Sequence, residues 1–267
     1  AYKGMVEHTD GLVGRVRRAF GAFVGGRGTP YLFGYLSDHG DTIGEHGVFG
    51  KKTFFEKSVK IPLLLAGTGV AAGRRWDEPV SILDVGPTVC AWAGAETPER
   101  ADGQSLASIL RGEDGPRGRA VLSESMDKGP DGRWTYGCMA RRGTYKFITY
   151  HGYESQNMLF DVAADPLEQN NLAAARPGMC EEFRWLLRQA TDPAAAEALQ
   201  AQHTKRARVL AAFEKQTGYD DRERYRDYPE EAKRPPEVCV TSLVGGPGKE
   251  QSSVYHGLPL RPQEGKA

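Results

Sequence analysis

Tyr31-Leu32-Phe33-Gly34-Tyr35-Leu36-Ser37-Asp38-His39-Gly40 is the stretch that decides the fold, because it joins an apolar run to two metal-binding residue types. The run 31–36 predicts a buried strand, and Asp38 and His39 follow directly after it. Carboxylate and imidazole groups are both ligands of divalent cations. Lys51 comes one glycine-rich loop later and is placed to hold an anion that such a metal also touches. The segment therefore predicts a metal-assisted site for a phosphate- or sulfate-like ester.

A purely structural role for Asp38 and His39 is the competing interpretation. An Asp after a strand caps the following turn, and a buried His often serves only as a hydrogen-bonding residue. Glycines at positions 40, 44, 47 and 50, however, allow the backbone to wind tightly around a ligand. The same loop carries more Asp, Glu and His side chains than a turn requires, and we expect His46 to position the loop rather than to bind metal. This context favours a ligand site.

The pattern around the segment predicts an α/β domain. Apolar residues recur at helical spacing over 2–20, Ile61–Ala66 predicts a second buried strand, and 80–92 has helical periodicity that stops at Gly94. Residues 54–59 form either a short helix or a loop. Such alternation is typical of a mostly parallel sheet covered by helices, and ligands bind beyond the carboxyl ends of its strands. The acid–imidazole pair falls at one of these ends.

The second half of the chain predicts a small antiparallel α+β subdomain. Its expected elements are strands at 121–124 and 158–161, a hairpin of 136–141 and 145–150, and a helix at 179–190. After about residue 204 the sequence becomes charge-dense and then rich in Pro and Gly, with a helix expected at 205–216. We therefore expect three parts: the end of the α/β domain (1–117), the antiparallel subdomain (118–203), and an extended or partly disordered tail (204–267).

Composition excludes several classes of protein. The 267 residues carry 35 Lys+Arg and 35 Asp+Glu, so the chain lacks the basic excess of a nucleic-acid binder. The mean hydropathy of −0.52 is typical of a soluble protein, and no apolar stretch approaches the roughly 20 residues of a membrane helix. No signal peptide is visible, and the chain opens directly on an amphipathic helix, which suggests an incomplete protein. The four cysteines form no CxxC pair, so neither a zinc ribbon nor a disulfide framework is indicated, and the compartment stays open.

The ordered series of motifs resembles the sulfatase family of the alkaline-phosphatase superfamily. It begins with Ser37-Asp38-His39-Gly40, Gly44-Glu45-His46-Gly47 and Gly50-Lys51. The resemblance runs in the family's order over about residues 1–190, and the further segments that carry it are 54–56, 61–64, 84–88, 102–106, 142–147, 159–161 and 165–172.

The resemblance implies an alkaline-phosphatase-like fold and assigns roles by position. Asp38 and His39 would be metal ligands, for calcium in typical sulfatases, and Lys51 would contact the sulfate and stabilise the leaving oxygen. The Asp-His form, where many relatives have Asp-Asn, is similar to the iduronate-sulfatase, choline-sulfatase and phosphonate-monoester-hydrolase branches. The last branch prefers transition metals, so Mn²⁺ and Zn²⁺ are alternatives to Ca²⁺.

The departures from the family pattern are equally informative. Family members carry their nucleophile in a Cys/Ser-x-Pro-x-Arg motif, whose Cys is oxidised to formylglycine, and an early Asp-Asp metal pair; neither is present here. The nearest pattern, Cys138-Met139-Ala140-Arg141-Arg142, falls in the predicted hairpin, where we expect an ordinary strand cysteine. Calcium takes roughly six to eight oxygen ligands, which Asp38 and His39 cannot supply alone. The resemblance thus implies a C-terminal portion that is inactive alone and is completed by a missing N-terminal portion or a complementary chain.

The sequence predicts a metal-dependent sulfuric ester hydrolase acting on a small sulfate ester, with neither nucleic acid nor membrane as partner. Two alternatives stay open: a phosphonate or phosphodiester hydrolase on the same scaffold, and a non-catalytic remnant or partner module. Arg133, Trp134, His151 and Tyr153 are candidates for the rim of the substrate pocket, and a surface position is equally compatible with them.

Overall fold

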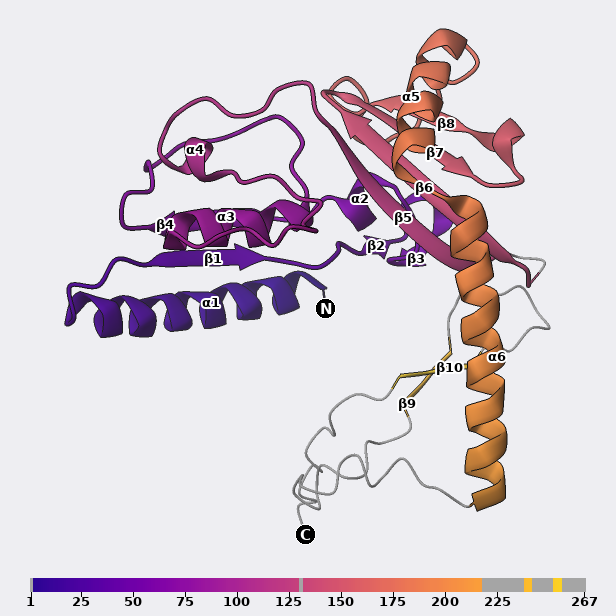
Figure 1. The fold of residues 1–267 in the computed structure, drawn as a ribbon, viewed down its shortest axis with the longest axis horizontal. Coiled ribbons are helices and arrows are strands. Elements are labelled where there is room, and N and C mark those ends of the chain that lie inside the picture. Colours follow the sequence, from indigo (N-terminus) through magenta and orange to yellow (C-terminus); the bar gives the residue numbers. More distant parts are fainter. Residues whose placement is uncertain (1, 130–131, 218–237, 242–251, 256–267) are drawn as a thin grey trace. The chain divides into compact units, whose positions relative to one another are not determined.

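A computed structural model describes residues 2–129, 132–217, 238–241 and 252–255 (Figure 1). The chain separates into two units, Ala1–Glu45 with Gly50–Glu197 and His46–Phe49 with Ala198–Ala267, which are described separately. None of the helices in the described part of the chain has the length and apolarity to cross a membrane. The elements are α1 (Tyr2–Gly25), β1 (Leu32–Leu36), β2 (Thr42–Ile43), the 3₁₀ turn η1 (Glu45–Gly47), β3 (Phe49–Gly50), α2 (Glu56–Val59), β4 (Leu63–Gly67), the 3₁₀ turn η2 (Ile82–Asp84), α3 (Val85–Ala93), α4 (Ala107–Leu110), β5 (Ala120–Lys128), β6 (Trp134–Arg142), β7 (Tyr145–Tyr150), the 3₁₀ turn η3 (Glu154–Gln156), β8 (Met158–Asp161), α5 (Pro177–Ala190), α6 (Pro193–Thr217), β9 (Val238–Thr241) and β10 (Ser252–Tyr255).

The predicted α/β class is confirmed, but the first two long strands pair differently from the expectation. β1 and β4 lie antiparallel, from Leu32 opposite Gly67 to Leu36 opposite Leu63, whereas the sequence predicted a mostly parallel sheet. A parallel pair needs a crossover that returns the chain to the starting edge, usually through a long helix. The only α-helix between β1 and β4 is the single turn α2, so the chain comes back along β1 in the opposite direction.

The layer around β1 is only partly covered, in contrast to the buried strands that the sequence predicted. Among the described strands, β1 and β4 pair only with each other, and Leu64 of β4 is 61% exposed. The amphipathic helix α1 is confirmed and lies along β1 (Figure 1). The ring centroids of Phe20 in α1 and Tyr31 lie 5.6 Å apart. Val24 is nevertheless the only buried residue of α1. A two-stranded sheet with one helix cannot bury the apolar side chains on both faces of the sheet.

Helix α3 begins later than the periodicity predicted, because a capping box sets its start. The Ser81 hydroxyl accepts from the Leu83 N–H, and the Asp84 carboxylate accepts from the Ser81 N–H, so residues 82–84 form a 3₁₀ turn before the helix. Asp84 is completely buried and also accepts from the Gln104 N–H and from the guanidinium of Arg119. Its carboxylate thus joins three segments of the chain.

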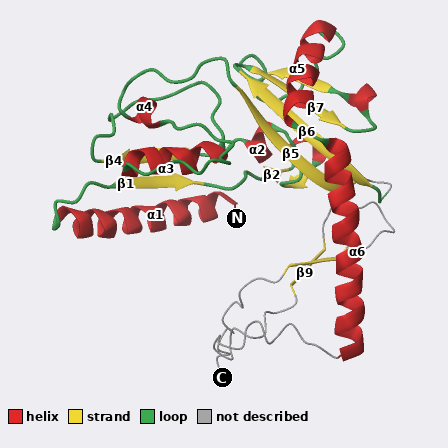
Figure 2. Cartoon of the chain, viewed as in Figure 1, coloured by secondary structure: helices red, strands yellow, loops and turns green. Residues whose placement is uncertain are grey.

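The predicted antiparallel strands and hairpin are confirmed. The four strands follow the order β5-β6-β7-β8, all antiparallel, and β6 and β7 are joined by a two-residue turn at Gly143-Thr144 (Figure 2). Gly143 has a φ of 56°, a conformation that glycine adopts without strain. Helix α5 confirms the predicted helix at 179–190 and extends it by two residues at the N-terminus.

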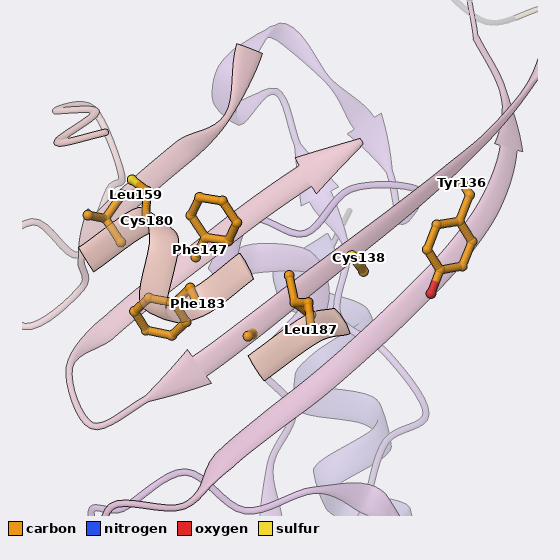
Figure 3. Close-up of a cluster of buried hydrophobic side chains, with 8 residues drawn as sticks. Tyr136, Cys138, Phe147, Leu159, Cys180, Phe183 and Leu187 are labelled. Atoms are coloured by element: carbon orange, nitrogen blue, oxygen red, sulfur yellow. The ribbon is translucent and has the colours of Figure 1, made fainter. Parts of the chain in front are cut away.

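Helix α5 and the sheet enclose the main hydrophobic core (Figure 3). The rings of Phe147 on β7 and Phe183 on α5 stack with their centroids 5.9 Å apart. The remaining core residues come from β6, β8 and α5, and the whole cluster comprises Tyr136, Cys138, Ala140, Phe147, Leu159, Cys180, Phe183 and Leu187.

Helix α6 is longer than the helix predicted at 205–216. It begins at Pro193, a residue type that suits the first turn of a helix, and an alanine-rich run carries it forward. β9 and β10 pair antiparallel, with Val238 opposite Tyr255. Most of the tail predicted for 204–267 lies outside the described residues.

Candidate functional site

Asp38, His39 and Lys51, the three residues singled out in the sequence, lie together at the carboxyl end of β1. The Lys51 ammonium nitrogen lies 2.8 Å from His39 Nε2, and Asp38 Oδ2 lies 3.3 Å from the same ring nitrogen. The Asp38 side chain is 80% exposed and that of His39 is 36% exposed, so both are open to a ligand. The structure therefore places a carboxylate, an imidazole and an ammonium at one point on the surface of this unit.

The hydrogen bonds of His39 define which of its ring nitrogens is available. Nδ1 lies 2.8 Å from the carbonyl oxygen of Gly40, which can only accept, so Nδ1 carries the hydrogen. Nε2 then has a free lone pair, and the Lys51 ammonium donates to it. The Asp38 carboxylate beside it is a second acceptor. The Lys51 ammonium thus contacts the imidazole, and a backbone carbonyl fixes the ring in the tautomer that binds metals through Nε2.

The electrostatics at Asp38 keep its carboxylate ionised. Desolvation alone would raise the pKa of Asp38. Hydrogen bonds from the backbone N–H groups of Asp38 and His39, together with the nearby His39 and Lys51, outweigh this effect and lower the pKa below its ordinary value. The carboxylate is therefore available as an anionic ligand at neutral pH.

Gly40 allows the loop to pack tightly against the helix α2. A Cβ atom at position 40 would lie 2.1 Å from the Lys57 carbonyl oxygen, so no larger residue fits without moving the backbone. The Gly40 N–H donates to the Ser58 carbonyl oxygen at 2.7 Å. The residue next to His39 is thus held directly by α2.

The rest of the loop is shaped by glycines in left-handed or extended positive-φ conformations. Gly44, Gly47 and Gly50 have φ values of 124°, 71° and 99°, which only glycine adopts readily. The Glu45 carboxylate accepts from the Ile43 N–H at 2.8 Å, so this metal-capable side chain serves the turn.

A cavity of about 650 Å³ opens beside Asp38, His39 and Lys51, and its opposite wall comes from the antiparallel sheet. Residues 121–125 of β5 form this wall, and Tyr150 and Tyr153 add aromatic surface. Lys52 also lines the cavity and pairs with Asp127 of β5 at 2.9 Å. The two halves of the sequence thus contribute to one pocket.

Of the four rim candidates from the sequence, Tyr153 lines this cavity. His151 instead pairs with Glu197 at 2.8 Å, and Trp134 lies with its ring 5.5 Å from the Lys128 ammonium nitrogen. Arg133 is not among the residues that line the cavity, although the described part of the chain includes it.

The residues present fit part of the coordination shell of a divalent metal. Across the described residues, no three His, Cys, Asp or Glu side chains gather in a way that could hold a metal ion. Asp38 Oδ2 nevertheless lies 3.3 Å from His39 Nε2, so two atoms of metal-ligand type are adjacent. The donor set fits a metal as two of its ligands and requires the others from elsewhere.

A formylglycine nucleophile does not fit the described residues. The nearest pattern places Cys138 on β6, where it is 5% exposed within the hydrophobic core (Figure 3). Burial, followed by the charge of Glu124, raises the pKa of the Cys138 thiol to about 12. Arg141 of the same pattern is paired with Glu56. The expectation of an ordinary strand cysteine is confirmed.

Sequence reasoning missed one group of buried charges that lies behind the site. Lys146 on β7 is completely buried and pairs with Glu56 and Glu168. The signal in the sequence was a lysine within the largely apolar strand Tyr145–Tyr150, since a charge that is buried there must find a partner. Its partners, 90 and 22 residues away in the sequence, carry no local signal.

Known sulfatases are similar to this chain in sequence and in structure. The family model "N-sulphoglucosamine sulphohydrolase, C-terminal" matches residues 44–181. Arylsulfatase K of Danio rerio is 33% identical over 203 residues, which are 72% of this chain and 36% of that protein. Choline-sulfatase of Rhizobium meliloti is 38% identical over 142 residues, covering 52% of this chain and 26% of that enzyme. A solved 2-O GAG sulfatase is 31% identical with a TM-score of 0.53, covering 59% of this chain and 35% of that structure.

The family model covers Lys51 and the strands β5 to β8, and it begins after Asp38 and His39. The chain spans between about a quarter and about a third of the length of the curated relatives named above. The family model covers more than half of this chain, from Gly44 in the site loop to Glu181 in α5. The chain therefore belongs to the sulfatase family of hydrolases and corresponds to the C-terminal portion of its members.

Proposed function

We propose that Asp38, His39 and Lys51 form one wall of a site that hydrolyses a small sulfate ester. The observation that supports this most is the contact of the Lys51 ammonium with His39 Nε2 at 2.8 Å beside Asp38, at the mouth of a cavity of about 650 Å³. A cation and two metal-ligand types at the mouth of one cavity suit an anionic ester. The sulfatase relatives support sulfate rather than another anion.

Lys51 would bind the ester through its charge. Its three N–H donors can shift from His39 to the oxygens of a bound sulfate group, because the side chain is long and exposed. A positive charge fixed near the scissile bond stabilises the negative charge that develops on the leaving oxygen. Lys51 would thus act on both the bound ester and the transition state.

Asp38 and His39 would hold a divalent metal, for which calcium is the first candidate and Mn²⁺ or Zn²⁺ are alternatives. When bound, such an ion polarises an oxygen of the ester and withdraws charge from the reacting centre. The described residues supply the Gly40 carbonyl that orients His39 and the backbone N–H groups that keep Asp38 ionised. This chain itself therefore sets the orientation of the His39 ring and the ionised state of Asp38.

The remaining ligands and the nucleophile would come from polypeptide outside these residues, either an N-terminal portion or a complementary chain. Without them we expect the chain to be inactive. The exposed apolar surface of the first layer supports this: Leu64 is 61%, Val16 60% and Met5 59% exposed. A groove of about 670 Å³ between α1 and the strands β1 and β4 is lined by the same kind of residues. Contiguous apolar surface of this kind marks an interaction site.

The division of the chain is part of the same proposal. Residues 1–117 would be the end of the catalytic α/β domain and 118–203 the subdomain that closes the pocket, with 204–267 as a tail.

The test is to sequence the DNA upstream of the Ala1 codon and to express the continuous open frame. We expect it to encode a Cys/Ser-x-Pro-x-Arg motif and an Asp-Asp pair, and the product to hydrolyse 4-nitrophenyl sulfate in a metal-dependent way that EDTA abolishes. A phosphonate monoester tested in parallel separates the two ester classes. Faster turnover of the phosphonate would assign the site to that class, and a frame that closes without either motif would leave a non-catalytic relative.

A further inference from the structure

Helix α2, which holds the site loop, is capped by a residue more than a hundred positions away. α2 is a single turn, Glu56–Val59, too short to persist on its own, and its N-cap Phe55 has no side chain that could accept a hydrogen bond. The carboxylate of Glu168 takes this place and accepts from the Glu56 N–H at 2.6 Å. Tertiary contacts, rather than local sequence preference, therefore hold α2 in place.

The same end of α2 rests on a buried group of charges, the Lys146 cluster, made of Lys146, Glu56, Glu168 and Arg141. The Lys146 ammonium donates to the Phe54 carbonyl oxygen at 2.8 Å and to Glu56 at 3.1 Å, and it pairs with Glu168. Arg141 donates to the same Glu56 oxygen at 3.1 Å. Two cations and two carboxylates balance each other, as burial of charge requires.

The ionisation of Glu56 agrees with this arrangement. Burial alone would raise the pKa of Glu56. The charges of Lys146 and Arg141 and the hydrogen bond from Lys146 outweigh burial and lower the pKa below its ordinary value. The cluster is thus built around an ionised carboxylate at the first residue of α2.

At its other end, α2 holds both partners of the proposed site through a single residue. The buried hydroxyl of Ser58 donates to the Lys51 carbonyl oxygen at 2.7 Å. The Ser58 carbonyl accepts from the Gly40 N–H at 2.7 Å, and the Gly40 carbonyl oxygen lies 2.8 Å from His39 Nδ1. A continuous hydrogen-bonded path therefore runs from the Lys146 cluster through α2 to Lys51 and His39.

We infer that Lys146 and Glu168 are positioning residues that fix the Lys51–His39 contact through α2. They do not line the cavity, so their action on the site passes through the backbone of residues 54–58. The meaning of this contact for catalysis rests on the function proposed above, but the geometric coupling does not. The three segments that meet here, 54–56, 142–147 and 165–172, all belong to the motif series in the sequence.

A purely stabilising role for Lys146 makes a different prediction. Lys146→Met removes the charge and keeps much of the side-chain volume, and it lowers the stability of the chain because Glu56 and Glu168 lose a buried cation. If Lys146 only stabilises the sheet, this change leaves the Lys51 ammonium where it was. If Lys146 positions α2, the same change frees Lys51.

The test is brief acetylation of the folded 267-residue chain, with the extent at Lys51 and Lys52 measured by mass spectrometry. Lys52 is the internal control, because it is held by Asp127 of β5 rather than through α2. We expect Lys146→Met to raise acetylation of Lys51 several-fold and to leave Lys52 unchanged. Arg117→Met, which removes an exposed arginine that pairs with Asp114, should leave both lysines as in the parent chain.

Unchanged acetylation of Lys51 in Lys146→Met, or an equal rise at Lys51 and Lys52, would overturn the inference.

A second pair of variants tests the inference if Lys146→Met does not fold. Glu168→Gln retains an oxygen that can accept from the Glu56 N–H, whereas Glu168→Ala does not. We expect hydrogen exchange at Glu56 to be faster in Glu168→Ala than in Glu168→Gln, and equal rates would contradict the capping role.

Acetylation and hydrogen exchange are measured without any enzymatic reaction. The positioning role and the proposed function can therefore be refuted independently. Release of Lys51 in Lys146→Met together with absent sulfate-ester hydrolysis by the completed enzyme would refute the function and leave the positioning role. If instead the completed enzyme hydrolyses the sulfate ester in a way that depends on Lys51, and acetylation of Lys51 is unaltered in Lys146→Met, the proposed function stands and the positioning role is refuted.

Discussion

Arg119 donates both terminal nitrogens of its guanidinium group to the carboxylate of Asp84, which is completely buried. Asp84 ends the 3₁₀ turn before α3, and Arg119 directly precedes β5. The segments beside these residues, 80–82 and 121–125, both line the cavity of the proposed site. The ion pair therefore fixes the distance between two walls of that cavity.

Replacing Asp84 by Asn should destabilise the chain and flatten its pH dependence. Desolvation would raise the pKa of Asp84, but the hydrogen bonds from Arg119, Gln104 and Ser81 lower it. A lowered pKa in the folded state stabilises the fold above the ordinary Asp pKa of about 4, and this stabilisation is lost as the pH falls through the lower folded value. Loss of one partner of a buried pair costs about 3–5 kcal/mol. Urea denaturation at pH 7 and at lower pH measures both effects.

Arg117→Met is a suitable control for this experiment, because it removes an exposed arginine two residues from Arg119. We expect its unfolding free energy to stay close to that of the parent at both pH values. If the Asp84→Asn variant loses stability at low pH as steeply as the parent chain, protonation of Asp84 is not the cause of that loss.

Gly40→Ala should destabilise the loop that carries His39. The new Cβ would lie 2.1 Å from the Lys57 carbonyl oxygen, and such a clash forces a backbone shift that costs about 1–3 kcal/mol. Gly86→Ala in α3 is the matched control, because no atom lies within 4 Å of its new Cβ and alanine favours a helix. Urea midpoints should therefore fall for Gly40→Ala and hold or rise for Gly86→Ala. Equal midpoints would contradict the packing of the loop on α2.

Cys138 should resist alkylation in the folded chain. Burial and the charge of Glu124 raise the pKa of its thiol to about 12, so the reactive thiolate is scarce at pH 8. The half-buried Cys90 provides the comparison within the same sample. Mass spectrometry after brief iodoacetamide treatment should show modified Cys90 well before Cys138. Modification of Cys138 as fast as that of Cys90 would contradict its assignment as an unreactive strand cysteine.

Asp38→Ala should weaken metal binding in the completed enzyme. The carboxylate is one of two ligands that this chain would supply, so its loss should raise the Ca²⁺ concentration for half-maximal activity by more than the 10–100-fold typical of supporting residues. Activity measured over a calcium titration gives this value. A titration curve identical to that of the unmodified enzyme would exclude Asp38 from the metal site.

The sequence predicted the elements whose order depends on local pattern. Helix α1, the β6–β7 hairpin, β8 and α5 all follow from periodicity and turn residues, and the structure confirms them. The position of Asp38 and His39 at a strand end also follows from the apolar run before them. These predictions succeeded because each depends on neighbours within a few residues.

The sequence could not predict the contacts that span the chain. The antiparallel pairing of β1 with β4 depends on the path of the intervening loop, and the cap of α2 depends on Glu168, 112 residues from Glu56. The capping box of Ser81 and Asp84 was a missed feature with a local signal, because a Ser followed three residues later by an acid is typical of a helix start. The partners of buried charges must be found in three dimensions.

The central claim, that Lys51 acts on a sulfate ester, is tested most directly by the kcat/KM for 4-nitrophenyl sulfate of the completed enzyme carrying either Lys51→Ala or Lys52→Ala. The two lysines are adjacent and both exposed, but Lys51 contacts His39 whereas Lys52 pairs with Asp127. We predict that Lys51→Ala lowers kcat/KM by about 10²–10³-fold, as expected for loss of a group that stabilises charge in the transition state, with Lys52→Ala near the unmodified enzyme. Equal values for the two variants would contradict the account.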